Sequence, residues 1–117
     1  MARVVMMYRT PTDTAAFDAH YFDTHVPLAR LLPGLRKYEI VQGEALIDTP
    51  EVHLMATFHF DDADAANFAL TSPEGLAAEA DRRTMVADDQ VVMLLVDGFE
   101  MPFEWANPED SENHLLS

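Results

Sequence analysis

The sequence has no cysteine, and this absence removes several classes of protein at once. A chain without thiols has no disulfide scaffold, no thiolate metal site and no cysteine nucleophile. Glycine is also scarce, with 4 in 117 residues, which excludes a glycine-rich loop for phosphates or dinucleotides. No apolar run approaches the about 18 residues of a membrane-spanning helix, and the N-terminal apolar run is too short for a signal peptide. We therefore expect a soluble, cytoplasmic protein.

Basic residues are few as well. Lys and Arg together number 7 against 21 Asp and Glu, which gives a formal net charge of −14 at pH 7. Because a surface of that sign repels phosphate backbones and anionic lipids, we expect neither nucleic acid nor a membrane as a partner. Hydrophobic residues make up 49% of the chain, which argues against disorder. A chain of this length can bury one core, so we expect a single domain.

Hydrophobic periodicity predicts strands and helices in the order β-α-β-β-α-β. The strands are expected at residues 3–8, 35–42, 54–60 and 91–96, and the helices at 14–32, 63–70 and 72–85, with a loop at 43–51. The first helix is expected to be interrupted at residues 24–27, because Val26 precedes a proline and Thr24 can cap a new helix. This order indicates an α+β fold, the ferredoxin-like split β-α-β arrangement with one antiparallel four-stranded sheet.

The predicted strands are apolar on both faces. In residues 91–96 the side chains of Val91, Met93 and Leu95 point one way and three further apolar side chains point the other way. Since the helices can cover only one face, the other face predicts a homodimer that packs sheet to sheet. The alternative is that residues 99–106 fold back over that face. We expect residues 1–98 to form the domain and residues 99–117 an acidic tail, free to pack on the partner subunit.

Residues capable of chemistry gather in the first helical region. Tyr21 and His25 are four residues apart and share a helix face with Phe17. A polar pair in an apolar row must either form hydrogen bonds or line a cavity. Imidazole is also the side chain that titrates near neutral pH, which suits proton transfer. The alternative interpretation is that His25 only braces the interruption of the helix.

The remaining histidines are weaker candidates. His20 lies five residues before His25, a spacing that places two side chains on different faces of an α-helix and disfavours a two-histidine metal site. We expect no metal ion, and His20 lies either in the substrate site or toward solvent. On the third predicted strand, His53 and His59 have the same parity and are expected to face away from Leu54.

Five short segments carry a family pattern. The most specific one is HYFDTHVPLA at residues 20–29, and the others are VMMYR at 5–9, PGLRKY at 33–38, FHFDD at 58–62 and SPEG at 72–75. Together they resemble the EthD-like family, named after ethyl tert-butyl ether degradation, over roughly residues 3–98. The resemblance implies membership of the dimeric α+β barrel superfamily. It also implies a ligand site between the sheet and the helices of each subunit, but not a particular reaction.

Carried onto this sequence, the resemblance makes His25 the leading catalytic candidate with Tyr21 beside it, and the candidate substrate-binding residues are Tyr8, His20, Tyr38 and Met85. The first hypothesis is a cofactor-independent enzyme of the isomerase, dehydratase or monooxygenase-like kind. It would act on a small apolar carbonyl compound or aromatic catabolite by histidine-mediated proton transfer. The second hypothesis is a non-catalytic ligand-binding or accessory protein of an oxidative degradation pathway.

Overall fold

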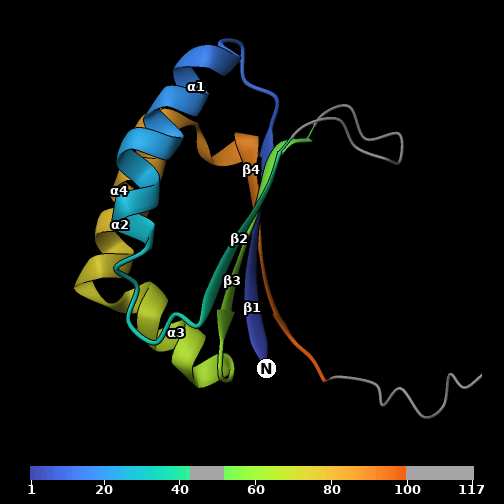
Figure 1. The fold of residues 1–117 in the computed structure, drawn as a ribbon, viewed down its shortest axis with the longest axis vertical. Coiled ribbons are helices and arrows are strands. Elements are labelled where there is room, and N and C mark those ends of the chain that lie inside the picture. Colours follow the sequence, from blue (N-terminus) through green and yellow to red (C-terminus); the bar gives the residue numbers. More distant parts are fainter. Residues whose placement is uncertain (43–51, 100–117) are drawn as a thin grey trace, which may run out of the picture.

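The computed structural model describes residues 1–42 and 52–99 (Figure 1). The strands are β1 (Ala2–Arg9), β2 (Lys37–Gln42), β3 (Val52–Phe60) and β4 (Val91–Asp97). The helices are α1 (Thr14–His20), the π-helix η1 (Tyr21–His25), α2 (Val26–Ala29), α3 (Ala63–Thr71), α4 (Pro73–Met85) and the short 3-10 helix η2 (Asp88–Gln90). The predicted order of elements is confirmed. The predicted loop at 43–51, and the predicted tail beyond Phe99, lie outside the described residues.

The four strands form one antiparallel sheet in the order β2-β3-β1-β4. All the α-helices lie on one side of this sheet, as Figure 1 shows with the sheet seen edge-on. The fold is therefore the predicted α+β, ferredoxin-like split β-α-β arrangement. The core lies between the helices and the sheet, and β1 contributes every second residue to it, namely Ala2, Val4, Met6 and Tyr8.

Side-chain caps begin the helices where the sequence places short polar residues. Asp13 accepts a hydrogen bond from the Ala16 N–H at 3.0 Å, and Ser72 accepts one from the Gly75 N–H at 3.1 Å. Gly75 also allows α4 to start against the end of α3. A Cβ atom built at this position would lie 2.2 Å from the Ala69 carbonyl oxygen, so only glycine fits there. The junction is tight, with Ser72 as the single residue between α3 and α4.

The first α-helix is interrupted close to the predicted residues, but the expected departure of Val26 from helical geometry and the expected cap at Thr24 were wrong. The backbone stays helical from α1 through η1 into α2, and the Val26 N–H bonds the Tyr21 carbonyl five residues back. Thr24 lies inside this wider turn and does not cap a new helix. Pro27 lies directly after this wider turn, at the second residue of α2. The Val26 N–H is therefore paired within the helix.

One strand residue does not follow the predicted alternation. The pairing of β1 with β3 shifts register between Tyr8 and Arg9, where Tyr8 pairs with Leu54 and Arg9 with Val52. His53 lies between those partners, and its ring meets the ring of Phe17 on α1 at 5.4 Å. The prediction that His53 faces away from the helices was therefore wrong, because a bulge re-aims a side chain. His59 follows the prediction and bonds Glu39 at 2.5 Å.

The face of the sheet opposite the helices carries many apolar side chains. Val92, Leu94 and Val96 on β4 are 42%, 44% and 42% exposed, and Leu94 pairs with Val5 of β1 on this face. The predicted two-faced character of β4 is confirmed by its register, since Met93 pairs with the buried Met6 on the helix side. Among the described residues, no helix combines the length and apolarity needed to cross a bilayer.

Candidate functional site

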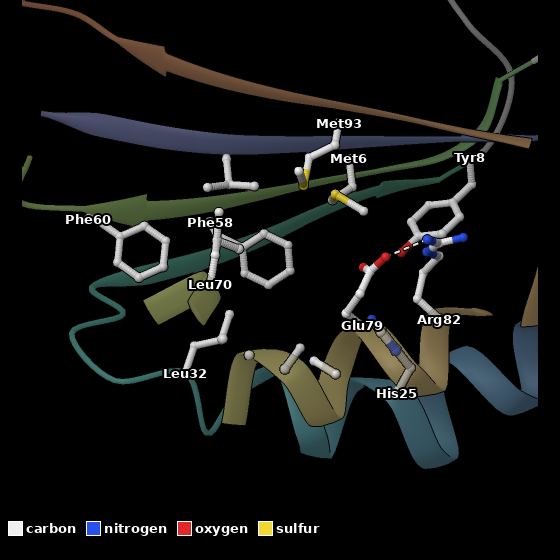
Figure 2. Close-up of a pocket in the computed structure, with 14 residues that line it drawn as sticks. Met6, Tyr8, His25, Leu32, Phe58, Phe60, Leu70, Glu79, Arg82 and Met93 are labelled. Atoms are coloured by element: carbon white, nitrogen blue, oxygen red, sulfur yellow. Dashed lines mark hydrogen bonds and ion pairs between the residues drawn. The ribbon is translucent and has the colours of Figure 1, made fainter. Parts of the chain in front are cut away.

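A cavity of about 270 Å³ lies between the helices and the sheet (Figure 2). Most of its wall is apolar and comes from both layers, including Val4, Met6, Leu32, Phe58, Phe60 and Leu70. Met93 of β4 adds a further apolar side chain from the edge of the sheet. The polar wall consists of four side chains, those of Tyr8, His25, Glu79 and Arg82. A small apolar cavity with a few convergent polar groups is the usual form of a small-molecule site.

His25 is the histidine that reaches this cavity. It is 4% exposed, and its Nδ1 lies 3.0 Å from Oδ2 of Asp81 on α4. Burial lowers the pKa of His25 below its usual value, although the hydrogen bond and the charge of Asp81 oppose the shift. The imidazole is therefore neutral at pH 7. Because a carboxylate only accepts hydrogen bonds, the proton of the ring lies on Nδ1 and the lone pair on Nε2.

His20 binds the other oxygen of the same carboxylate. Its Nε2 lies 2.9 Å from Asp81 Oδ1, and its side chain is 37% exposed. Burial alone would raise the pKa of Asp81, but the hydrogen bonds from His20 and His25 outweigh burial and hold the pKa below its ordinary value. The prediction that His20 and His25 face different sides was wrong. A five-residue spacing matches the wider turn of a π-helix, which the α-helical geometry of the prediction did not include.

Tyr8 places a hydroxyl in the polar wall of the cavity. The side chain is 1% exposed, and its ring packs edge-on against the rings of Phe17 at 5.5 Å and Tyr21 at 5.6 Å. Within the described part of the chain, the Tyr8 hydroxyl has no hydrogen-bond partner. Burial raises the pKa of Tyr8 well above its ordinary value, so the hydroxyl keeps its proton. It is therefore a donor available to a ligand oxygen.

Tyr21 lies behind the wall of the cavity. Its ring is tilted against the His25 ring with centroids 5.2 Å apart, as the four-residue spacing predicted. Its hydroxyl bonds the Tyr38 hydroxyl at 2.6 Å, and the Tyr38 ring stacks on Phe58 at 4.4 Å. Neither phenol is among the residues that line the cavity, and neither is Met85, which packs against the core at the end of α4. His25 and Tyr8 thus both line the cavity, and the Tyr21 ring contacts the rings of both.

Sequence reasoning missed three side chains, all on α4. Asp81 orients His25, while Glu79 and Arg82 line the cavity. Charged residues at such positions are typical of a helix face exposed to solvent. A signal was nevertheless present, because Gly75, Ala78 and Arg82 follow one another at spacings of three and four and so share one helix face. All three are buried. Small residues on an inward helix face leave space against the sheet. Among the described residues, no group of three or more His, Asp or Glu side chains is placed to hold a metal ion.

The fold and this cavity define a class of protein: an α+β ferredoxin-like chain with a small-molecule pocket between helices and sheet. The model of the EthD domain family matches residues 9–89, and the chain belongs to that family. A relative in Rhodococcus erythropolis, an uncharacterised 11.0 kDa protein of the thcB-thcC intergenic region, is 36% identical over 98 residues, covering 83% of this chain and 94% of that protein.

Solved structures share the fold. An EthD family protein of Bacillus halodurans is 29% identical, with a TM-score of 0.77 over 85% of this chain and 99% of that chain. A dimeric ferredoxin-like protein of Thermobifida fusca is 19% identical, with a TM-score of 0.64 over 83% and 90% of the two chains. SnoaB of Streptomyces nogalater, a cofactor-independent oxygenase, is also 19% identical, with a TM-score of 0.60 over 86% and 94%. At such identities the last two establish the fold alone.

Proposed function

We propose that this protein is a cofactor-independent enzyme that moves a proton on a small, largely apolar carbonyl or aromatic compound, in an isomerisation or a dehydration. The observation that carries the proposal is a buried, neutral His25 that faces a ligand-sized cavity and has its Nδ1 held by Asp81. This pairing leaves Nε2 as a base toward a ligand. A base oriented by a carboxylate is the recurring arrangement for general base catalysis.

The proposed step is the removal of a proton from a carbon next to a carbonyl group. The Nε2 of His25 takes the proton, the electron pair of the C–H bond forms a C=C bond, and the carbonyl π pair moves onto oxygen. The Tyr8 hydroxyl donates a hydrogen bond to that oxygen as it gains negative charge. The imidazolium formed on His25 is stabilised by Asp81 at 3.0 Å. It then returns the proton to another carbon, or to a departing hydroxyl group that leaves as water.

Tyr21 supports the site from behind in this proposal. Its ring packs against both His25 and Tyr8, and its hydroxyl is committed to Tyr38. It fixes the two rings that meet the ligand and makes no direct contact with the reacting atoms. Positioned proton transfer contributes about 10²–10⁴-fold and an oxyanion donor about 3–4 kcal/mol, which suffices for a C–H bond already activated by a carbonyl.

Hydrogen–deuterium exchange tests this function without knowledge of the natural substrate. The C–H exchange of 2-tetralone and of a β,γ-unsaturated butenolide is followed by NMR in buffered D₂O. We expect the protein to accelerate exchange, and His25→Gln to lose about 10²–10⁴-fold of that acceleration while keeping the circular dichroism spectrum and Tm of the wild type. Glu74→Gln, at an exposed position of α4 that does not line the cavity, is the control and should keep full activity. Binding of both compounds with no accelerated exchange would favour the non-catalytic ligand-binding alternative and reject the proposal.

We further propose that the protein works as a homodimer whose two sheets face each other. The support is the apolar outer face of the sheet, where Val5, Leu94 and their neighbours have no cover among the described residues. Proteins of this fold include chains described as dimeric. In such a dimer the polar pair His59 and Glu39 would lie at the interface, already hydrogen-bonded to each other.

A further inference from the structure

The cavity has two chemically different ends (Figure 2). Phe60, Leu32 and Leu70 gather at one end, and Tyr8, Glu79 and Arg82 gather at the other. A ligand that fills the cavity therefore places an apolar body against the first group and a polar head against the second. The character of the polar head depends on which hydrogen-bonding groups at that end remain free.

Arg82 has little capacity left for a ligand. Its Nη2 donates to Glu79 at 2.5 Å and to Asp88 at 2.8 Å, and its Nη1 donates to the Val86 carbonyl at 3.2 Å. Two carboxylates therefore compensate the guanidinium charge, and the side chain is 6% exposed. In the described part of the chain, its Nε is buried without a partner. Of its five N–H groups, the Nε–H and one Nη1–H remain. Because a two-point grip on a carboxylate needs Nη2 as one of the two donor nitrogens, and Nη2 is fully used, these two donors cannot provide it.

Glu79 supplies the free acceptor at this end. Its Oε1 takes the hydrogen bond from Arg82 and lies 3.5 Å from Arg83, whereas its Oε2 accepts no hydrogen bond from the described residues. A ligand head that approaches the cavity wall therefore meets a carboxylate oxygen beside the Tyr8 hydroxyl. A ligand hydroxyl can donate to the first group and accept from the second. A carboxylate head carries a full charge throughout binding and would face the charge of Glu79. Among the described residues that line the cavity, Arg82 is the one arginine or lysine, and two carboxylates already compensate its charge.

We propose that this cavity selects a neutral aromatic or enolic compound with a hydroxyl group in its head, and discriminates against carboxylates. The proposal rests on the cavity of the proposed function, but it needs no proton transfer to be tested. The formal net charge of −14 acts in the same direction, since it disfavours the approach of any anion. The substrate class is thus a phenol or an enolised ketone.

The test uses three probes that share one naphthalene body and differ in the head: 2-naphthol, 2-methoxynaphthalene and 2-naphthoate. Their dissociation constants are measured by calorimetry at pH 7 with the full-length protein. We expect 2-naphthol to bind about tenfold or more tightly than 2-methoxynaphthalene, because only the former donates to a charged acceptor. We expect 2-naphthoate to bind at least tenfold more weakly than 2-naphthol.

The variant Glu79→Gln isolates the proposed acceptor. It should weaken 2-naphthol about tenfold and strengthen 2-naphthoate, so that the preference for the neutral probe is lost. Glu74→Gln is the matched control, because it removes the same charge from an exposed residue of the same helix that does not line the cavity. It should keep the wild-type order. The inference is overturned if the wild-type protein binds 2-naphthoate as tightly as 2-naphthol, or if it binds none of the three probes. The proposed proton transfer is tested separately by deuterium exchange.

Discussion

At the residue scale, the placement of one carboxylate decides what His25 can do. Asp81 lies on α4, 56 positions away in the sequence, and holds Nδ1 of His25 with one oxygen and Nε2 of His20 with the other. Its side chain is 12% exposed and that of His20 is 37% exposed. The three side chains therefore connect the cavity to the surface. Removal of Asp81 separates the role of His25 as a base from its role in packing.

We expect Asp81→Asn to slow the deuterium exchange at least tenfold, because the amide no longer fixes the proton on Nδ1. The acidic limb of the pH profile reports protonation of His25 and lies below the ordinary histidine value of about 6.5, since burial lowers the pKa of His25. Because Asp81 raises that pKa, its loss should move the limb to still lower pH. Exchange rates of both proteins from pH 4 to 8 provide the measurement.

His20→Gln is the control for this prediction. It keeps the carboxylate and leaves the hydrogen bond to His25 in place, so the limb should stay close to that of the wild type. An unchanged limb in Asp81→Asn would mean that the carboxylate does not influence the base, and the role assigned to Asp81 would be wrong.

At the element scale, the junction of α3 and α4 forms part of the wall of the cavity. Gly75 lets α4 start directly against α3, and the same residue lines the cavity. We expect Gly75→Ala to destabilise the protein by about 2–3 kcal/mol, because the new methyl group would overlap backbone oxygens that cannot move independently. Urea unfolding followed by circular dichroism measures this difference. Gly98→Ala, at a position with no atom within 4 Å of the added Cβ, should change stability by less than about 0.5 kcal/mol. Equal stability of the two variants would contradict the packing described here.

The sequence could predict features that arise within one element, but not those that depend on contacts between elements. The strands and the contact of Tyr21 with His25 could be predicted, because each depends on the residue period within one element. The order of the elements along the chain then indicated the antiparallel sheet. The π-helical turn of residues 21–25 has no distinct period, so the shared face of His20 and His25 was missed. The charged face of α4 was also missed, because burial of Arg82 depends on its pairing with Glu79 and Asp88 after folding. The register shift that re-aims His53 likewise depends on pairing between strands.

At the scale of the whole molecule, the described residues of one chain leave the apolar outer face of the sheet exposed. Strand β4 lies at the sheet edge, and its three side chains on this face, Val92, Leu94 and Val96, are all more than 40% exposed. Burial of a leucine or valine side chain stabilises by about 1.5–3 kcal/mol, and a two-fold interface counts each residue twice. Several such residues give a second copy enough to offset the entropy lost on association.

Leu94→Glu tests this interface. In a sheet-to-sheet dimer the variant places two buried charges between the layers, so we expect the dimer dissociation constant to rise at least about 100-fold. Sedimentation equilibrium over a range of micromolar concentrations measures it. Leu31→Glu is the matched control, because Leu31 follows α2 on the helix side and is already 63% exposed. It should dimerise like the wild type. A wild-type protein that sediments as a single chain throughout this range would mean that another cover protects the face, and the proposed homodimer would then be wrong.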